Sequence, residues 1–132
     1  IMLDIDRFKK VNDTYGHDAG DMVLREIALL LKQNVRAEDV VARYGGEEFV
    51  IIIPGAGADV AVGLAERLRE KIADAEMVYE GQRIHVTASL GVACEICSPD
   101  FEIEGLVKKA DTALYGAKNA GRNRVSLYSP DA

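Results

Sequence analysis

Residues 40–53 read Val40-Val41-Ala42-Arg43-Tyr44-Gly45-Gly46-Glu47-Glu48-Phe49-Val50-Ile51-Ile52-Ile53. Two apolar runs flank a polar centre with adjacent glycines, which is the pattern of a β-hairpin. Adjacent glycines supply the positive φ angles of a tight turn, and their missing Cβ atoms let a ligand approach the backbone closely. The sequence therefore predicts a hairpin with two carboxylates at its tip.

The two neighbouring carboxylates at the tip, Glu47 and Glu48, repel each other. A divalent cation that bridges to a phosphate ligand would explain them, because hard cations prefer carboxylate oxygens. A solvated turn is the alternative interpretation of Gly45-Gly46-Glu47-Glu48 when it is taken alone. The rest of the chain is needed to choose between the two.

The composition is that of one globular domain. The chain has 132 residues, of which 48% are hydrophobic and 29% charged. Its net charge of −6 argues against a broad nucleic-acid-binding surface. No apolar run is long enough to span a membrane, and no signal peptide is visible. Cys94 and Cys97 form a lone C-x-x-C that we interpret as structural, and free thiols suit a reducing cytoplasm.

Hydrophobic periodicity predicts strands that alternate with helices. Residues 1–5 are expected to form a buried strand that ends in carboxylates, and residues 84–92 a strand with unlike faces. Three amphipathic helices are expected, the first from residue 18 to about residue 35 with Asp18 and Asp21 as a capping box. The other two helices are expected at residues 61–72 and 103–117. Two short strands are expected at residues 77–79 and 124–128.

This order of elements contains a βαββαβ core with a further helix and strand. Such a chain is typical of the α+β class, with a mostly antiparallel central sheet backed by flanking helices. Catalytic and binding groups gather where the strands of such a sheet end. We therefore expect the chemistry of this protein at the strand ends.

Several charged groups are expected to meet there. Asp4 ends the first strand, and neighbouring strands can bring it close to the hairpin carboxylates. Asp6 lies on the same face of the strand as Asp4 if the strand continues that far; otherwise Asp6 starts the turn. Backbone N–H groups and lysines of Arg7-Phe8-Lys9-Lys10 can cradle a polyphosphate. Lys118 and Arg122 add cations after the last helix, although with Gly121 as the C′ residue they are equally typical of an ordinary helix end.

Together these residues resemble the GGDEF domains, the diguanylate cyclases. The similarity runs from end to end through five segments in one order, and no P-loop or dinucleotide-binding fingerprint competes with it. The segments are Leu3-Asp4-Ile5-Asp6-Arg7-Phe8-Lys9-Lys10-Val11-Asn12-Asp13, Gly16-His17-Asp18-Ala19-Gly20-Asp21, Arg43-Tyr44-Gly45-Gly46-Glu47-Glu48-Phe49, Ser89-Leu90-Gly91-Val92, and Ala110-Asp111 through Gly121-Arg122-Asn123.

The resemblance implies a polymerase-palm-like, nucleotidyl-cyclase-like fold and one GGDEF catalytic domain over residues 1–132. Two GTP molecules, one on each of two facing domains of a homodimer, would condense into cyclic di-GMP with release of pyrophosphate. Two Mg²⁺ ions per GTP, for which Mn²⁺ can substitute, would be bound by Asp4, the backbone carbonyl of Ile5 and Glu47. Glu48 would lie near the attacking 3′-hydroxyl as a metal ligand or base, which fits two-metal chemistry.

The resemblance also implies the substrate contacts. Phe8 and Lys9, with Lys118 and Arg122, would hold the β and γ phosphates, and Gly45 and Gly46 would lie against the substrate. Asn12 and Asp21 would read the guanine edge. A carboxylate at Asp21 can accept hydrogen bonds from the guanine N1–H and exocyclic amine, a pattern that adenine lacks; the helix cap is its alternative role.

A second motif, Arg36-Ala37-Glu38-Asp39, matches the R-x-x-D inhibitory motif of the family, with a solvated loop as the alternative. Arginine can chelate O6 and N7 of guanine bidentately. The resemblance therefore implies product inhibition by cyclic di-GMP at Arg36 and Asp39, with Arg67 as a secondary contact or else a plain surface residue. The five residues between Asp39 and Gly45 span roughly 17 Å at strand geometry, so this site need not overlap the substrate site.

The chain departs from the family pattern at its start. It begins within the first strand, so we expect a piece of a longer protein that lacks here the usual N-terminal helix, its D-x-L-T-G-L-x-N-R-R motif and an upstream regulatory domain. The signature keeps a carboxylate at its third position as Glu47. The intact set of acids and amides favours catalysis over the alternative, a non-catalytic receptor for cyclic di-GMP or GTP. The expected location is the cytoplasm, including the cytoplasmic part of a membrane-bound protein.

Overall fold

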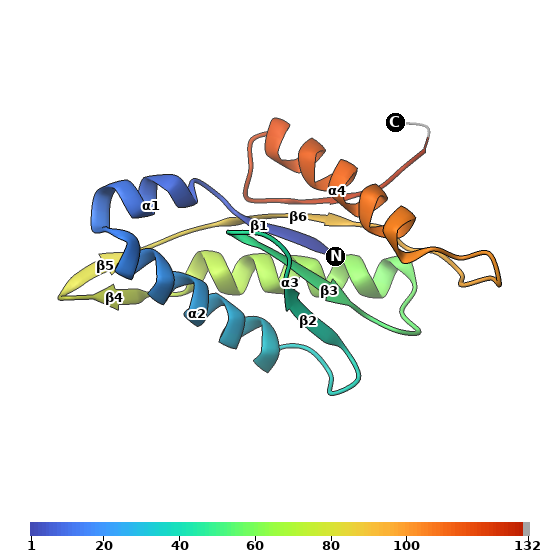
Figure 1. The fold of residues 1–132 in the computed structure, drawn as a ribbon, viewed down its shortest axis with the longest axis horizontal. Helices are drawn as coiled ribbons and strands as arrows, with labels where there is room; N and C mark the ends of the chain where they lie inside the picture. The colour runs from blue at the N-terminus through green and yellow to red at the C-terminus, as the bar shows by residue number, and fades with distance from the viewer. Residues whose placement is uncertain (131–132) are drawn as a thin grey trace.

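The computed structural model of the chain describes residues 1–130. Five strands form one sheet in the order β2-β3-β1-β6-β7, while β4 and β5 form a separate hairpin (Figure 1). The elements in chain order are β1 (Met2–Ile5), α1 (Phe8–Tyr15), α2 (His17–Gln33), β2 (Val40–Arg43), β3 (Glu48–Ile52), α3 (Ala58–Asp74), β4 (Met77–Tyr79), β5 (Gln82–Ile84), β6 (Ala88–Val92), α4 (Ile103–Asn119) and β7 (Val125–Leu127).

Strand β1 lies at the centre of the sheet. It pairs antiparallel with β3, where Asp4 lies opposite Glu48, and antiparallel with β6, where Asp4 lies opposite Ser89. Strand β2 pairs antiparallel with β3, and β7 joins β6 in parallel. The predicted α+β class with a mostly antiparallel sheet is therefore confirmed, as is the hairpin around the glycines.

Helices cover both faces of the sheet, with α4 on one side and α2 and α3 on the other (Figure 1). Leu3 and Ile5 belong to the larger core, which they share with apolar side chains of α2 and α3. Met2 packs with Ala110 and Leu114 of α4. Side chains alternate along a strand, so Asp4 lies on the same face as Met2. The period of β1 thus sets Asp4 towards α4.

The predicted helices around residues 61–72 and 103–117 are α3 and α4. In α3 all five apolar residues of the predicted stripe are buried, namely Ala61, Leu64, Ala65, Leu68 and Ile72. The short strand at residues 77–79 is β4, and the closing strand is β7. Strong amphipathic periodicity was therefore sufficient to locate the two helices.

The prediction of one strand with unlike faces over residues 84–92 is wrong. Strand β5 ends at Ile84 and β6 begins at Ala88. All five residues of β6 are buried, including Ser89 and Gly91. These two residues face α4 rather than solvent, so the alternation reflects a need for small residues under a closely packed helix.

Residues 7–10, which we expect to cradle a polyphosphate, form the start of a helix. Arg7 has a left-handed backbone with φ 54°, and α1 begins at Phe8, whose side chain is buried. The capping box at Asp18 and Asp21 is also wrong, because α2 begins at His17 and no side chain caps it. Gly16, with φ 94°, makes the sharp connection between α1 and α2.

The hairpin turn does not use the positive φ angles that we predicted for Gly45 and Gly46. The glycines with positive φ are Gly16, Gly55, Gly81 and Gly121. Residues 44–47 connect β2 to β3, and this connection is longer than the two-residue turn that requires such angles.

Gly121 is the C′ residue of α4, as predicted. Its N–H donates to the carbonyl of Lys118 at 3.3 Å, and the N–H of Arg122 donates to the carbonyl of Ala117 at 3.1 Å. These two bonds are the Schellman pattern, which satisfies carbonyls left free at a helix end.

Two further features bear on the class of protein. Among residues 1–130, no helix is both long and apolar enough to cross a bilayer. Cys94 and Cys97 are free and exposed in the segment that follows β6.

Gly91→Ala is expected to lower the free energy of unfolding by about 1–3 kcal/mol through overpacking. A Cβ at this position would lie 2.1 Å from the carbonyl oxygen of Ala110 and 2.2 Å from the nitrogen of Leu114, both backbone atoms of α4. Urea denaturation measures the loss.

Gly116→Ala is the matched control for that substitution. A Cβ there would meet only Ser126 Oγ, at 3.7 Å. Alanine is favoured over glycine inside a helix by roughly 0.8–1 kcal/mol, so the control is expected to gain stability. A Gly91→Ala protein as stable as the parent would contradict the close packing of α4 on β6.

Candidate active site

Three carboxylates lie where β1 ends and β3 begins. Asp4 is buried, with 5% of its surface exposed, and Glu47 and Glu48 are half-buried. Asp4 and Glu48 face each other across the β1–β3 ladder, and the N–H of Ile5 donates to the carbonyl of Glu47 at 3.2 Å. The predicted meeting of the first strand with the hairpin carboxylates therefore has a direct basis in strand register.

The carboxylates at this site resist ionisation. Burial raises the pKa of Asp4 above its ordinary value, against the lowering effect of Lys118. Burial followed by the negative charge of Asp4 raises the pKa of Glu47 and of Glu48, and Asp111 adds to the effect on Glu48. A bound cation would favour the ionised form of these groups and offset the cost of their burial.

One such cation belongs to the protein. Lys118, in the last turn of α4, donates from Nζ to Asp4 Oδ2 at 2.6 Å. The side chain of Asp4 is 7% exposed and that of Lys118 is 33% exposed, so the pair is partly shielded from water. Lys118, predicted as a phosphate contact, thus lies beside a predicted metal ligand.

The oxygen donors at this strand end suit a hard divalent cation. Within residues 1–130, no three His, Cys, Asp or Glu side chains lie close enough together to hold a metal ion by themselves. The predicted ligand set consists of two carboxylates, Asp4 and Glu47, and the backbone carbonyl of Ile5. Such a set of oxygens fits Mg²⁺, which keeps several water ligands and usually takes only one or two protein carboxylates.

The hairpin tip is held by Arg43, which sequence reasoning did not single out. Its Nε donates to the carbonyl of Gly45 at 3.2 Å and its Nη2 to that of Gly46 at 2.7 Å. The N–H groups of Tyr44 and Gly45 converge on the carbonyl of Glu48, at 2.8 and 3.3 Å. A Cβ on Gly45 would lie 3.1 Å from Glu48 Oε1, so glycine leaves room for that carboxylate.

Helices α1 and α2 carry the residues predicted to contact the rest of a nucleotide. The Phe8 side chain is in the core, so only its backbone is available to contact a ligand. The first N–H groups of a helix lack intrahelical partners. Lys9 is exposed beside it. The start of α1 can therefore offer donors and a positive charge to an anion.

The predicted guanine contacts lie on the facing parts of α1 and α2. Asn12 rests against Gly20, where a Cβ would come within 1.9 Å of Asn12 Oδ1. Asp21, the next residue, is exposed and lines an open hollow of ≈ 460 Å³ with Arg43 and Phe49 of the hairpin. The missing side chain of Gly20 thus makes space for the Asn12 amide beside Asp21.

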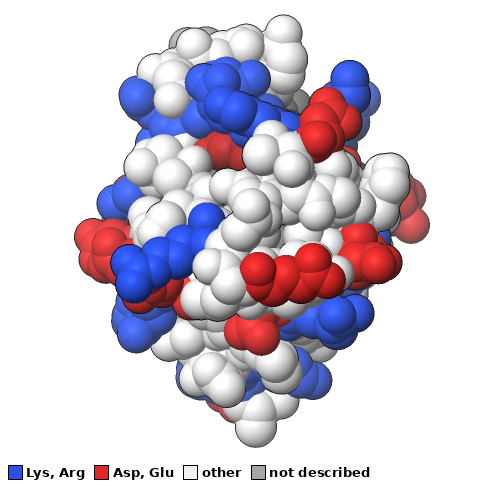
Figure 2. Space-filling view, turned by 90° about the vertical axis from the view of Figure 1, so that its left-hand side faces the viewer, with Lys and Arg blue, Asp and Glu red and all other residues white. Residues whose placement is uncertain are grey.

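Basic side chains follow the end of α4. Arg122 is exposed and has a left-handed backbone with φ 65°. On the face shown in Figure 2, a group of basic side chains lies near the top, where α4 ends in Figure 1, and acidic atoms are visible below it. Elsewhere on this face the two signs of charge are interspersed.

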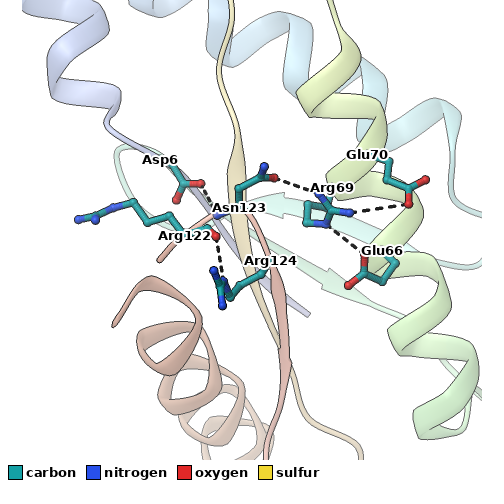
Figure 3. Close-up of polar contacts among 7 residues, drawn as sticks. All are labelled: Asp6, Glu66, Arg69, Glu70, Arg122, Asn123 and Arg124. Atoms are coloured by element: carbon teal, nitrogen blue, oxygen red, sulfur yellow. Dashed lines mark hydrogen bonds and ion pairs between the residues drawn. The ribbon is translucent and has the colours of Figure 1, made fainter. Parts of the chain in front are cut away.

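Asp6 has a different role from Asp4. It is buried and accepts hydrogen bonds from Thr87 Oγ1, Ser89 Oγ and the N–H of Asn123. Figure 3 shows the part of this network that includes Asn123. Strand β1 ends at Ile5, so Asp6 lies just beyond it, in the turn.

The R-x-x-D residues lie at the other end of β2 from the carboxylates. The Asp39 carboxylate accepts from the N–H of Arg36 at 2.8 Å, and Arg36 Nη2 donates to the carbonyl of Pro54 at 3.3 Å. Arg36, Asp39 and Arg67 line one hollow of ≈ 400 Å³ between the loop and α3. The predicted secondary contact therefore shares a surface with the motif.

Residues 1–124 match the family model described as diguanylate cyclase, GGDEF domain. Diguanylate cyclase A of Treponema denticola is 46% identical over 130 residues, a match that covers 96% of this chain and 34% of that protein. Response regulator PleD of Caulobacter vibrioides is 46% identical over 127 residues, which cover 95% of this chain and 28% of that protein. The chain thus spans about a third of the length of these curated relatives.

Solved structures show the same fold. The GGDEF domain of DgcB from Caulobacter crescentus, crystallised in complex with c-di-GMP, has a TM-score of 0.89 and 35% identity, covering 96% of this chain and 75% of that one. The active GGEEF domain of a diguanylate cyclase from Vibrio cholerae has a TM-score of 0.87 and 35% identity, covering 97% of this chain and 80% of that one.

Glu47→Gln is expected to raise the free energy of unfolding near neutral pH without divalent cations. The pKa of Glu47 is raised in the fold, so the parent loses stability as the pH rises through that raised pKa, and a neutral amide avoids the loss. Below the ordinary glutamate pKa the carboxyl is protonated in both states, so the difference is expected to vanish. Urea unfolding at about pH 3.5 and about pH 7.5 tests this.

Glu26→Gln, at an exposed position of α2, is the control for removing one negative charge. If Glu47→Gln stabilises the protein at the higher pH no more than Glu26→Gln does, the burial of the Glu47 carboxylate and its repulsion by Asp4 do not destabilise the fold.

Proposed function

The chain belongs to the GGDEF family of diguanylate cyclases, and we propose that it condenses two GTP molecules into cyclic di-GMP with release of pyrophosphate. The observation that carries this proposal is the register that sets Asp4 opposite Glu48, together with the hydrogen bond from Lys118 of α4 to Asp4. This arrangement combines oxygen ligands for a divalent cation with a cation for phosphate. Both are needed to bind a nucleoside triphosphate.

Asp4, the carbonyl of Ile5 and Glu47 would hold the divalent cations, two per GTP, as Mg²⁺ or Mn²⁺. When bound, such ions stabilise the attacking and leaving oxygens of an in-line displacement. Glu48 lies beside this set and would orient the attacking 3′-hydroxyl or accept its proton. The raised pKa of Glu48 favours a role in proton transfer, because a base works best when its pKa approaches the working pH.

The remaining residues would bind and orient the substrate. The N–H groups at Phe8 and Lys9, with the charges of Lys9, Lys118 and Arg122, would neutralise the β and γ phosphates. Gly45 and Gly46 would let the substrate approach the hairpin backbone. Asn12 and Asp21 would select guanine through its Watson–Crick edge.

The reaction requires two copies of the domain. Each would bind one GTP, and the 3′-hydroxyl of each nucleotide would attack the α-phosphorus of the other, forming a new P–O bond while the bond to pyrophosphate breaks. Two such steps close the ring. A homodimer that faces its two sites together is therefore part of the proposal, and an upstream domain of the full protein would control its formation in the cytoplasm.

We also propose that the product inhibits the enzyme. Cyclic di-GMP would bind in the hollow lined by Arg36, Asp39 and Arg67, where two guanidinium groups can meet guanine edges and phosphates. This hollow adjoins the start of β2, whose other end leads into the catalytic hairpin. Bound product would stiffen that hairpin or hold the two domains apart.

Incubation with GTP and Mg²⁺, followed by mass spectrometry of the products, tests the activity. The domain is fused to a constitutive dimeriser and supplied with an N-terminal segment of the family type. Cyclic di-GMP is the expected product. No product, together with tight binding of cyclic di-GMP by the same sample, would move the assignment to a receptor.

Glu48→Gln is expected to lower turnover by roughly 10²–10⁴-fold, the usual contribution of a positioned acid–base group. Binding of GTP is expected to persist, since the amide keeps the shape of the side chain. Glu104→Gln, at an exposed position in the first turn of α4, is the control. Full turnover by the Glu48→Gln protein would rule out the proposed role.

Arg36→Ala is expected to relieve inhibition by cyclic di-GMP, because it removes one of the two arginines that line the hollow. The measurement is the rate at increasing concentrations of added cyclic di-GMP, referred to the initial rate of the same protein. Unchanged inhibition would mean that the product acts elsewhere or that the other contacts suffice.

A further inference from the structure

Asp6 is a buried carboxylate whose partners are all hydrogen-bond donors from distant parts of the chain. Thr87 Oγ1 donates to Oδ2 and Ser89 Oγ to Oδ1, both at 2.7 Å. The backbone N–H of Asn123 donates to Oδ2 at 3.0 Å. The ion pairs found within residues 1–130 all involve other carboxylates. Hydrogen bonds alone therefore satisfy Asp6 and fix its orientation.

The turn that Asp6 holds has an unusual backbone. Arg122 and Asn123 are consecutive non-glycine residues with positive φ, 65° and 46°. Such conformations persist only where the surrounding structure enforces them. Besides the bond from the Asn123 N–H to Asp6, the turn has a second one, in which Arg124 Nε donates to the carbonyl of Arg122 at 3.1 Å (Figure 3).

Helix α3 holds the same turn from the other side. Arg69 Nη1 donates to Asn123 Oδ1 at 3.1 Å. Arg69 is itself fixed by ion pairs with Glu66 at 3.1 Å and Glu70 at 3.7 Å. Asn123 is therefore clamped between the end of β1 and α3, while the Arg122 side chain points away from this network (Figure 3).

We propose that Asp6 is a positioning residue for substrate phosphates. By holding the turn at Arg122 and Asn123, it sets where the Arg122 guanidinium stands relative to the triphosphate. This role rests on the proposed function, which assigns Arg122 to the phosphates. Asp6 itself needs no contact with the substrate, because protein donors occupy both of its oxygens.

Its place in the chain makes Asp6 a link between two parts of the site. It follows Asp4, the proposed metal ligand, by two residues, and it binds the turn that follows α4, the helix of Lys118. A shift of this turn would move a phosphate contact relative to the metal-binding strand end.

A comparison of GTP binding with GMP binding distinguishes a positioning role of Asp6 from a general disruption of the fold. Asp6→Asn removes the negative charge that strengthens the hydrogen bond from the Asn123 N–H, so the turn loses part of its anchor. The affinity for GTP is expected to fall about tenfold, the effect of one lost charge-assisted hydrogen bond. The affinity for GMP, which lacks the β and γ phosphates, is expected to stay at the parent value.

Arg69→Met tests the same role without changing β1. It releases Asn123 from the α3 side while keeping an apolar stem on the helix, and it is expected to weaken GTP binding and spare GMP binding. Arg83→Met is the matched control, since it removes an exposed ion pair with Glu76 near the β4–β5 hairpin. The control is expected to change neither affinity.

A double-mutant cycle shows whether Asp6 acts through Arg122. In an Arg122→Ala background, Asp6→Asn is expected to cause no further loss of GTP affinity, because coupled residues are not additive. An equal loss in both backgrounds, or an equal loss for GMP and GTP, would overturn the positioning role.

Amide hydrogen exchange gives a readout that does not depend on the activity. The Asn123 N–H is expected to be protected in the parent and to exchange faster in Asp6→Asn; unchanged exchange overturns the role. A parent that binds no GTP overturns the proposed function and this role with it. A parent that binds GTP, with an Asp6→Asn variant that binds it equally well, overturns this role alone.

Discussion

Strand β1 is paired on both edges and covered on both faces, and the rest of the structure depends on this constraint. Its alternation directs Leu3 and Ile5 into the main core and Met2 towards α4, so Asp4 also lies towards α4. Its register with β3 brings the hairpin carboxylates to the same end. A one-residue slip would move every one of these side chains to the opposite face. Packing of the core and placement of the candidate site are therefore consequences of one strand register.

Charge at this strand end is balanced in two different ways. Asp4 is paired with Lys118, whereas Asp6 is satisfied by hydroxyl and backbone donors. A group paired with the end of one long, partly exposed lysine side chain can exchange that partner for a metal ion, while a group held by three donors keeps its geometry. Burial raises the pKa values of Asp4, Glu47 and Glu48, so ionisation of these groups is unfavourable where the chemistry is proposed. Such local destabilisation is common at functional sites, where activity and stability compete.

Several glycines, which have no side chain, are needed for this architecture. Gly91 lets α4 lie directly on β6, Gly20 makes room for Asn12, and Gly45 leaves space for Glu48. At these three positions the requirement is close approach, since none of them has a positive φ. At Gly16 and Gly121 the requirement is conformational instead, because the chain turns sharply at the start of α2 and the end of α4. One residue type thus serves two physical purposes along this chain.

The sequence by itself determined the elements with strong periodicity, because the apolar stripe of α3 and the apolar runs of β2 and β3 depend only on neighbouring residues. It also indicated the candidate site residues through motif spacing. It did not reveal α1, in which only Phe8 and Val11 are buried, or the burial of both faces of β6. The sequence also did not reveal the hydrogen-bond partners of Asp4 and Asp6. Those partners are 81 to 117 residues away in the chain. Only the order of strands and the packing of α4 bring them together, because a hydrogen bond depends on position in space and not on separation in sequence.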